Sequence, residues 1–383
     1  MTIDDLRYFH TAEGYDLLRE ASALSGSNLA VLMQLRKKYA AENCRAALLL
    51  RDLRDHATAK FSRAKDMVFD REGLEQSSGE EIATYRAGRY QNFARVADVC
   101  CGIGGDAVAL AKNAEVVAVD INLHRLAITR WNAQIYGVAD HVQTVCADAG
   151  QWIPKADAIF FDPSRRKNGV RLFSLSDYAP PVQLDKLQTI TSHIGIKVAP
   201  GLPEEDIPPD CEVEFISESR SCKEAVLWFG DLRTQTSRRA TLLPGGHTLT
   251  FRSVAAVPVC PPGAYIAEPD NAVVRAHLID QIASDLNAWK LAPDVAYLSA
   301  DHALESPFVQ SYPVVDILPF NLKKLQHYIT HRHIGRLDIK KRHFPITPEV
   351  LHSRLKLKGD GWVVLFLTRI NQHPTVIVCD PPK

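Results

Sequence analysis

The sequence predicts an α/β chain built around a doubly wound, mainly parallel sheet, with a helical region before it and a smaller α+β module after it. Two observations carry this prediction. Between residues 95 and 200, short apolar runs alternate with segments of helical length, which is the order of parallel βαβ units. Outside that region, the apolar spacing is helical before it and a mixture of strand and helix after it.

The length of the chain supports several domains, because 383 residues exceed a typical single domain. We expect a helical region at 1–85 and the sheet domain at 86–256. A stretch rich in proline and glycine, "VPVCPPG" at 257–263, ends this domain. Two small C-terminal pieces, 264–320 and 321–383, complete the predicted organisation.

The predicted elements follow in chain order. In the helical region, "SNLAVLMQLRKKYAAENCRAALLLRDLRDHATAKF" lacks proline, and Ser27 or Asn28 is a suitable N-cap. The parallel strands are expected in "RVADVCC", "AEVVAVDI", "HVQTVCAD", "ADAIFFDP" and "IGIKVAPG". "CEVEFISES" and "EAVLWFGDL" have no helix between them, so they are expected to form an antiparallel pair. The C-terminal pieces mix helices with strands and end in a hairpin of "GWVVLFLTRI" and "PTVIVCD", and we interpret the final "CDPPK" as disordered.

Composition argues against several classes of protein. The chain has no apolar run long enough to span a bilayer, and its start, "MTIDDLRYFH", carries acids where a signal peptide would be basic. The eight cysteines form no CxxC pair, which argues against a zinc ribbon or a redox motif. We therefore expect reduced thiols in a cytoplasmic protein without a metal centre.

Charge is unevenly distributed, although the chain is formally neutral. Between Asn321 and Lys358, ten Lys or Arg stand against two acids, a net charge of +8. A basic module in a neutral protein favours a polyanionic partner, and the alternative is a solvated basic face. His327 and His331 have the spacing of a metal-binding pair, but no cysteine or acid cluster accompanies them, so we interpret them as surface residues.

A glycine-rich turn follows the first predicted strand. In "DVCCGIGGDAV", Gly102, Gly104 and Gly105 allow a tight turn and a close approach of a ligand to the backbone. The spacing also matches a loose dinucleotide fingerprint, and a plain strand-to-helix turn is a third interpretation. The glycines alone do not distinguish these three possibilities.

Three acids, Asp98, Asp120 and Asp148, mark the ends of the first three strands. The carboxyl ends of neighbouring parallel strands meet in one crevice, where ligands bind. Asp120 can accept hydrogen bonds from two ribose hydroxyls, Asp148 can face an adenine amino group, and Asp98 can face an ammonium group. An acid beside the glycine turn suits a cationic sulfonium with an α-amino group better than a dinucleotide phosphate. The pattern therefore indicates S-adenosylmethionine rather than NAD.

These residues carry a resemblance to a known family. Through "DVCCGIGGDAVALA", "VVAVDIN" and "WNAQIYGVADHVQTVCADA", residues 69–166 resemble the class I methyltransferases, especially the trimethylguanosine synthases that methylate N2 of guanine in RNA. The whole chain resembles bacterial class I methyltransferases with a C-terminal THUMP-like domain, which implies a ferredoxin-like segment at 264–320 and a THUMP-like module at 321–383. The resemblance implies a Rossmann-like sheet. The expected S-adenosylmethionine contacts are Asp98, Cys100, Gly102, Gly104, Asp120, Ile121, Asp148 and Ala149.

The motif "FFDPSRR" ends the fourth predicted strand, where amino-methylating members of this fold carry Asp/Asn-Pro-Pro-aromatic. The Asp162 carboxylate and the Pro163 carbonyl can accept both N–H bonds of an exocyclic amine and turn its lone pair toward the methyl group. Ser164 and Arg165 stand where that motif has its second proline and its aromatic residue. An arginine plane can stack on a base or pair with a phosphate. We expect these four residues to be catalytic, and the alternative is a plain strand end with solvent-facing arginines.

The sequence thus predicts a methyltransferase that acts on a base nitrogen in RNA, with guanine N2 as the simplest target. The expected RNA contacts are Arg165, Arg166, Lys340, Lys341 and Arg342. Two alternatives stay open. One is a small-molecule methyltransferase whose C-terminal module shapes the pocket, and the other is an RNA-binding protein that keeps the cofactor fold without catalysis.

Overall fold

The computed structural model describes residues 1–164, 166–167, 170–171 and 174–382. They form two compact units: unit 1 comprises Met1–Val213 and Glu224–Gln235, and unit 2 comprises Glu214–Lys223 and Thr236–Lys383. The division runs through one hairpin, formed by β8 (Glu212–Glu218) and β9 (Ser221–Trp228). This hairpin therefore contributes residues to both units.

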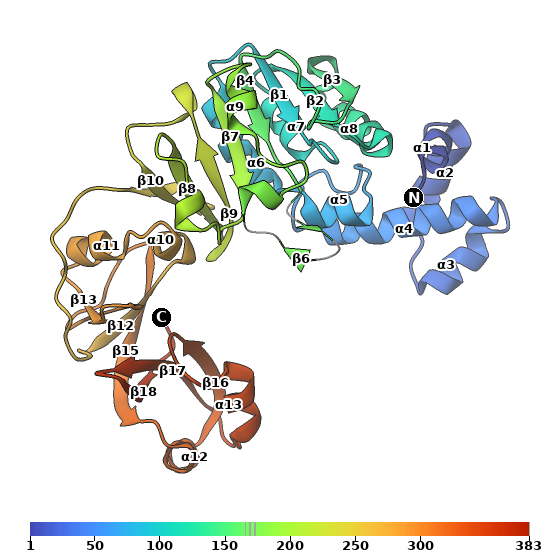
Figure 1. Cartoon of the computed structure of the whole chain (residues 1–383). Helices are drawn as coiled ribbons and strands as arrows, with labels where there is room; N and C mark the ends of the chain where they lie inside the picture. Colours follow the sequence, from blue (N-terminus) through green and yellow to red (C-terminus); the bar gives the residue numbers. More distant parts are fainter. Residues whose placement is uncertain (165, 168–169, 172–173, 383) are drawn as a thin grey trace. The chain divides into compact units, whose positions relative to one another are not determined.

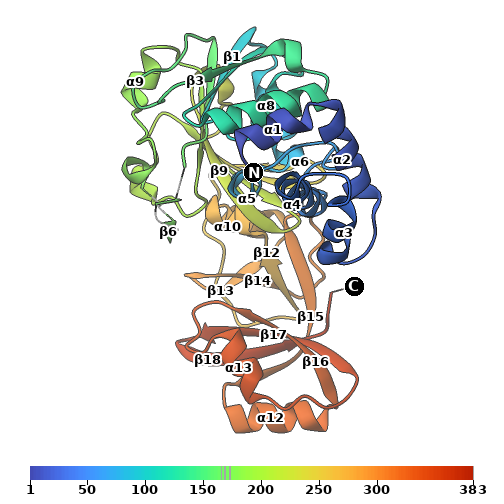
Figure 2. The same cartoon turned by 90° about the vertical axis from the view of Figure 1, so that its right-hand side faces the viewer.

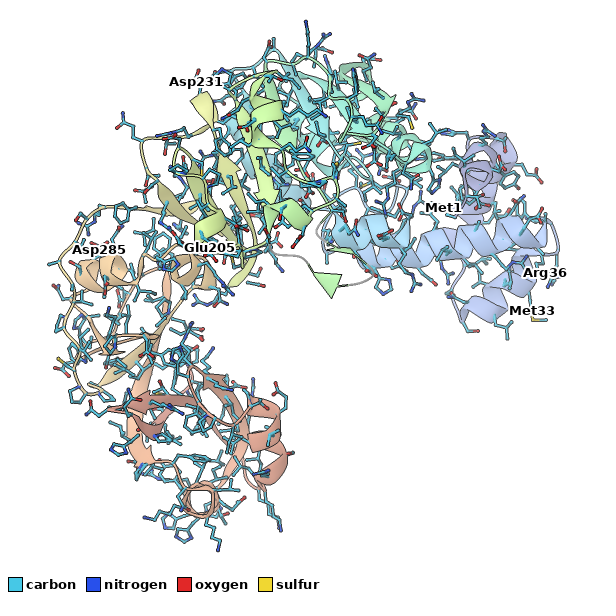
Figure 3. The ribbon with its side chains drawn as sticks, viewed as in Figure 1. Met1, Met33, Arg36, Glu205, Asp231 and Asp285 are labelled. Carbon is cyan, nitrogen blue, oxygen red and sulfur yellow. The ribbon has the colours of Figure 1, made fainter. Side chains whose placement is uncertain are left out.

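Unit 1 begins with a series of helices (Figure 1). Their bounds are α1 Ile3–Phe9, α2 Ala12–Ala23, α3 Asn28–Leu35, α4 Ala41–Ala57, α5 Arg71–Gln76 and α6 Glu80–Ala87. Side-chain caps fix where they begin: Thr2 and Asp5 form a capping box, and Ser27, a predicted N-cap, accepts the backbone N–H of Ala30. α3 is apolar around most of its circumference, so Met33, labelled in Figure 3, stays 65% exposed.

The helical region packs on the sheet domain through α8 (Leu123–Ile135), as Figure 2 shows for α1 and α8. Leu17 and Val68 share a buried core with Trp131 of α8. The rings of His10 and Trp131 lie with their centroids 4.0 Å apart. The buried Asn132 side chain accepts the Val68 N–H at 2.9 Å and donates to the Val68 carbonyl at 3.1 Å. The N-terminal helices and the sheet domain therefore share a hydrophobic core and belong to the same unit.

The sheet of unit 1 has the strand order β9-β7-β4-β1-β2-β3. Its other strands are β1 Arg95–Val99, β2 Glu115–Asp120, β3 Val142–Cys146, β4 Ala158–Phe161 and β7 Ile194–Val198. Neighbours from β3 to β7 pair in parallel, whereas β9 pairs antiparallel with β7. The predicted doubly wound sheet with its antiparallel closing strands is therefore confirmed.

The strand order reverses between β1 and β4, which places a topological switch point there. The remaining elements of unit 1 include α7 (Gly105–Leu110), which contacts β1, α9 (Leu184–Gln188) and the short antiparallel pair of β5 (Arg166–Lys167) and β6 (Val170–Arg171). The Asp162 N–H donates to the Val99 carbonyl at 3.1 Å, so the segments that leave β1 and β4 start side by side. Ligands of open α/β sheets bind in the crevice at such a point.

Unit 2 contains a seven-stranded sheet of order β13-β14-β12-β15-β18-β17-β16. Its strands are β12 Tyr265–Pro269, β13 Trp289–Ala292, β14 Val295–Ala300, β15 Val309–Pro319, β16 Ile334–Lys341, β17 Gly361–Ile370 and β18 His373–Cys379. Its helices are α10 Asn271–Arg275, α11 Ile279–Asp285, α12 Leu322–His331 and α13 Pro348–Arg354. β10 (Arg238–Leu243) and β11 (His247–Thr250) pair antiparallel and are the last strands of the nine-stranded sheet, whose full order is β11-β10-β8-β9-β7-β4-β1-β2-β3.

The C-terminal strands have a core on each face. α12 and α13 bury Leu325 and Leu351 against one face, where Leu365 of β17 lies. On the other face, the ring of Phe366 meets the rings of Tyr297 and Tyr312, with centroids 5.0 Å away in both cases. The predicted hairpin of β17 and β18 is confirmed.

The interpretation of "CDPPK" as a disordered end is wrong for the part that the structure describes, residues 379–382, and Lys383 lies outside the described residues. Cys379 is fully buried at the end of β18, and the Asp380 N–H donates to the Pro313 carbonyl at 3.0 Å. Pairing with β15 holds this segment, and sequence position alone gave no sign of it.

Candidate active site

The turn after β1 adopts a backbone that favours glycine. Gly102 has a φ of 57° and Gly104, the N-cap of α7, has a φ of 84°. A Cβ on Gly104 would lie 2.8 Å from Cγ2 of Thr129, whereas a Cβ on Gly102 would meet no atom within 4 Å. Cys100 also has a positive φ, 65°, which is strained for a side chain of its kind. The turn is therefore tight on its α8 side and open above Gly102.

Asp120 holds this turn and keeps acceptor capacity. Its Oδ2 accepts the Gly102 N–H at 2.9 Å, and its Oδ1 accepts the Asn122 N–H at 2.8 Å. Each carboxylate oxygen can accept a further hydrogen bond. Beside it, Ile121 is 70% exposed, although it is a large apolar residue. A carboxylate next to an exposed apolar side chain suits a ribose with an attached base.

Asp98 is fully buried at the end of β1, and the structure shows no hydrogen-bond partner for either carboxylate oxygen among the described residues. Burial raises the pKa of Asp98 well above its usual range, and the negative Asp106 and Asp162 raise it further. A buried carboxylate without a partner is costly unless a ligand supplies one. This acid therefore fits a cationic group of a ligand.

Asp148 and Cys100 complete the rim of the crevice. Oδ1 of Asp148 accepts the Gly150 N–H at 2.8 Å, and Oδ2 accepts from Nε2 of Gln151 at 3.2 Å. Ala149 between them is buried. Burial raises the pKa of the Cys100 thiol well above its usual range, with Asp120 as the next cause. Both causes disfavour the thiolate, which argues against a nucleophilic role for Cys100.

Asp162 follows β4 and is paired with a buried lysine. Nζ of Lys197, on β7, lies 2.6 Å from Oδ2 of Asp162, and Lys197 is only 3% exposed. The pairing of β4 with β7 brings the two residues together. Ser164, two residues on, exchanges both backbone hydrogen bonds with Ala179 at 2.9 Å. The segment from Asp162 to Ser164 is therefore fixed at both ends, with Pro163 buried in its middle.

A charged network continues behind Lys197. Nζ of Lys197 also donates to Oγ of Ser78 at 3.0 Å, and Nη2 of Arg86 donates to the same oxygen at 2.7 Å. Arg86 forms ion pairs with Asp106 and Glu224 in the interior. The network thus links α6, α7 and β9 to the carboxylate at the end of β4.

Comparison with known proteins now places these features in a family. Over 327 residues, the chain is 32% identical to uncharacterised S-adenosylmethionine-dependent methyltransferases from two strains of Mycobacterium tuberculosis, covering 82% of this chain and 89% of each relative. The chain belongs to the S-adenosylmethionine-dependent methyltransferases. This methyltransferase also shares its fold with a crystal structure of a provisionally assigned methyltransferase from Porphyromonas gingivalis. The TM-score is 0.78 at 20% identity, covering 95% of this chain and 97% of the other.

Family models match three segments of the methyltransferase. Residues 93–190 match the RNA cap guanine-N2 methyltransferase family, and residues 309–381 match the THUMP domain-like family. Residues 2–57 match a family described only as a domain of unknown function. The first segment contains the glycine turn, the strand-end acids and Asp162. The recognition of a bacterial methyltransferase with a THUMP-like module is therefore confirmed.

The cofactor of the methyltransferase is S-adenosylmethionine, and the crevice fits it. The Asp98 carboxylate, for which the described residues supply no hydrogen-bond partner, suits a cationic end of the cofactor. Asp120 suits its ribose, and the exposed Ile121 suits its adenine. Of the expected contacts, the structure brings the turn after β1 and Asp120 into direct contact through the Gly102 N–H. Asp148 follows the neighbouring strand β3.

Sequence reasoning missed the network behind Asp162. Lys197 and Arg86 were not among the predicted site residues, and Glu224 had no assigned role. One signal was present for Lys197, a single charge inside the apolar run "IGIKV". A lysine in a strand buried on both faces needs a partner, so it pointed to a nearby acid.

The predicted RNA contacts differ in their surroundings. Arg165 lies outside the described residues, and for Arg166 the description covers only the backbone in β5. Lys340 pairs with Glu268 at 2.5 Å and lies over the Tyr312 ring. The guanidinium of Arg342 lies over the Tyr297 ring, 5.1 Å from its centroid. Lys340 and Arg342 are therefore half-buried residues with partners inside unit 2.

Neither a metal site nor a membrane span emerges from the part of the chain that the structure describes. Within it, no group of three or more His, Cys, Asp or Glu side chains could hold a metal ion. No helix in the same part of the chain combines the length and apolar character needed to cross a bilayer. The His327 and His331 rings lie with their centroids 6.2 Å apart on α12.

Proposed function

We propose that the methyltransferase modifies a base nitrogen in RNA, with the exocyclic N2 of guanine as the first candidate. The observation that carries this proposal is Asp162 at the end of β4, paired through one oxygen with Lys197 and placed beside the cofactor turn. The matches to an RNA cap guanine-N2 methyltransferase family and to a THUMP domain-like family support RNA as the substrate.

The ion pair between Asp162 and Lys197 distinguishes the two carboxylate oxygens of Asp162. Lys197 holds Oδ2, and we assign Oδ1 to accept one N–H of a substrate amine. The carbonyl of Pro163 accepts the second N–H. These two acceptors orient the nitrogen lone pair, which is otherwise delocalised into the ring of the base, and positioning of this kind lowers the barrier without a strong base.

The bound cofactor supplies an electrophilic methyl group on a sulfonium. Asp98, Asp120 and the Gly102 N–H would hold it at the end of β1. Asp162 and Pro163 would hold the amine at the end of β4. Because the switch point brings these strand ends together, one crevice serves both groups. The amine loses one proton to solvent after methylation, because alkylated nitrogen is a strong acid while it is cationic.

RNA docking is the second part of the proposal. We assign it to the exposed cations around α12, which we call the α12 basic face: Lys323, Lys324, Arg332, Arg354, Lys356 and Lys358. Gln326 of α12 joins the two segments, because its Nε2 donates to the Lys356 carbonyl at 3.0 Å and its Oε1 accepts the Lys356 N–H at 2.7 Å. Arg165, Arg166 and Lys341 stay in the proposed contact set.

Transfer of a labelled methyl group tests the proposal. Purified protein and labelled S-adenosylmethionine are incubated with total RNA and, separately, with small metabolites, both from cells that lack the protein. Label in RNA, followed by nucleoside mass spectrometry showing a methylated base nitrogen, is the expected result. Label confined to small metabolites would overturn the RNA assignment. The Asp162→Ala variant, which removes the side-chain acceptor, serves as the inactive control.

A further inference from the structure

A cavity of about 540 Å³ opens in unit 2 beside the edge strand β16. We call it the Trp362 cavity. Its wall includes Gln310, Tyr312, Asp338, Lys340, Glu349 and Trp362. The volume falls in the range of small-molecule binding sites, about 300–1,000 Å³. All of the residues that line it belong to unit 2, and none of them is at the end of β1 or β4.

The indole of Trp362 is held rigidly at the wall. Its Nε1 donates to Oδ2 of Asp338 at 2.9 Å, and the guanidinium of Arg336 lies over the ring, 3.8 Å from its centroid. Arg336 and Trp362 are register partners on β16 and β17, which explains the stack. Trp362 nevertheless stays 36% exposed. One face of the indole is covered by a cation, so the opposite face and the ring edge can meet a ligand.

Polar groups of both kinds surround this aromatic surface. The Tyr312 hydroxyl donates to Oε1 of Gln310 at 2.7 Å, which leaves the Gln310 amide N–H groups as donors. The carboxylates of Asp338 and Glu349 are acceptors. Lys340 adds a further donor, and its pairing with Glu268 neutralises its charge. The wall thus combines a stacking surface with hydrogen-bond donors and acceptors.

We propose that the Trp362 cavity binds one unpaired nucleobase of the RNA substrate. This inference rests on the proposed function, because it assumes RNA as the substrate. Single-stranded RNA is recognised by splayed bases that stack on aromatic rings and hydrogen-bond along their edges. Several residues of the cavity wall lie in the segment from Asn321 to Lys358, which has a net charge of +8. A segment with this charge favours a polyanion nearby.

The electrostatics select a neutral ring over a cation. Arg336 already occupies one face of the indole and draws on its negative potential. A second cation on the opposite face would be repelled by this guanidinium across the thickness of the ring. A neutral nucleobase suffers no such repulsion, and its amino and carbonyl groups match the acceptors and donors of the wall. The open face of the indole therefore suits a base better than an alkylammonium or an arginine side chain, and the carboxylates of Asp338 and Glu349 can accept from the amino group of that base.

Binding of short RNA to the full chain tests this directly. The probes are a single-stranded ten-nucleotide RNA of mixed sequence and the same RNA annealed to its complement, titrated without cofactor. Trp362→Ala is expected to weaken single-strand binding about ten- to a hundredfold, the measured range for loss of one stacked base. Duplex binding should change less than threefold, because its bases are not exposed. Trp362→Phe should recover most of the affinity, since it keeps a stacking ring.

Phe251→Ala is the matched control, because Phe251 is an exposed aromatic residue of unit 2 outside the cavity wall. Equal single-strand affinity for Trp362→Ala and the parent would overturn the proposal. Should Trp362→Ala fail to fold, photo-crosslinking of a 4-thiouridine oligonucleotide to the parent chain gives the answer. Crosslinks in β16 or β17 support the cavity, and crosslinks confined to other segments overturn it.

The same experiments separate this inference from the proposed function. If the cavity binds single-stranded RNA but no RNA becomes methylated, the proposed function fails and the cavity stands. If RNA is methylated and Trp362→Ala leaves both its affinity and its KM unchanged, the proposed function stands and the cavity assignment fails.

Discussion

The ammonium group of Lys197 lies 2.6 Å from Oδ2 of Asp162, so the carboxylate that would orient the substrate amine is itself oriented by a buried lysine of the next strand. The same ammonium donates to Ser78, which also accepts from Arg86. Asp162 therefore stands at the end of a charged network that reaches into the interior of unit 1.

Asp162→Ala should abolish most methyl transfer. The substitution removes one of the two acceptors proposed for the amine, and loss of a positioning group of this kind costs about 10²–10³ in rate. S-adenosylmethionine affinity, measured by calorimetry, should stay within a few-fold of the parent. Asp140→Ala, at an exposed acid on the surface of unit 1, is the control. An active Asp162→Ala enzyme would place the chemistry elsewhere.

Lys197→Met should lower kcat through Asp162. Without Lys197, the carboxylate loses the partner that fixes Oδ2, and the free energy of unfolding should fall by up to about 3 kcal/mol. Lys38→Met, at an exposed ion pair with Glu20, should barely change stability. The decisive measurement is the double variant with Asp162→Asn. If Lys197 acts through Asp162, the double variant is no slower than Asp162→Asn alone.

Sequence reasoning found one half of this site and missed the other for a physical reason. Asp98, Asp120 and Asp162 all lie directly at strand ends, and the carboxyl ends of parallel strands share one edge, so pattern alone predicts that they gather. The pairing of Arg86 with Glu224 joins residues 138 positions apart, and its partners depend on how α6 packs on the sheet. No local pattern encodes that packing.

In the C-terminal module, sequence also predicts less about the charged residues than the structure shows. Ten cations in one segment predict a basic module, but they do not predict which cations turn inward. On β16, alternate residues point to opposite faces, so Lys340 meets Glu268 and the Tyr312 ring. Only the tertiary contacts distinguish it from the exposed Lys323 and Lys324.

Asp98 should make the stability of the cofactor-free protein depend on pH. Burial and the neighbouring acids raise its pKa in the folded state, whereas an unfolded aspartate ionises near pH 3.9. Between these two pKa values, the folded state holds more protons, so this group lowers the free energy of unfolding as the pH rises. Asp98→Asn removes this pH-dependent contribution to stability, because an amide does not ionise.

Urea denaturation from pH 5 to pH 8 measures how Asp98 contributes to the pH dependence of the free energy of unfolding. The difference in unfolding free energy, Asp98→Asn minus parent, should increase with pH by up to about 1.4 kcal/mol per unit. Asp140→Asn should follow the parent at every pH. Parallel curves for Asp98→Asn and the parent would show that Asp98 is already ionised in the folded protein.

The two glycines of the turn should fail in different ways when replaced by alanine. Both have a positive φ, which costs about 1–2 kcal/mol for alanine. Gly104→Ala also forces Cβ against Thr129, so it should lose the larger amount of stability. Gly102→Ala meets open space, so it should instead lose cofactor affinity, tenfold or more. Gly88→Ala, with a negative φ and open space, is the control.

Thermal unfolding measures the stability of the Gly102→Ala and Gly104→Ala variants, and calorimetry measures their affinity for S-adenosylmethionine. Gly102→Ala with full S-adenosylmethionine affinity would mean that the open space above Gly102 is not the cofactor site. Such a result would leave the fold unaffected and would move the cofactor away from the turn.

The α12 basic face should carry the salt-dependent part of RNA binding. In the triple variant Lys323→Ala, Lys324→Ala and Lys356→Ala, RNA affinity should fall and the slope of log affinity against log salt should become shallower by up to about 2. Each lost phosphate contact on a single strand contributes about 0.7 to that slope. Cofactor affinity should not change, because the crevice lies in unit 1.

The control removes the same charge from the helical region, through Arg36→Ala, Lys37→Ala and Arg45→Ala, all exposed. Phosphate contacts position RNA without reading its sequence, so the loss at the α12 basic face should be equal for RNAs of different sequence. An equal loss in the control variant would mean that general charge, rather than this face, attracts RNA. Docking would then depend on the arginines that follow Pro163 and on the Trp362 cavity, whose stacking contact is only weakly sensitive to salt.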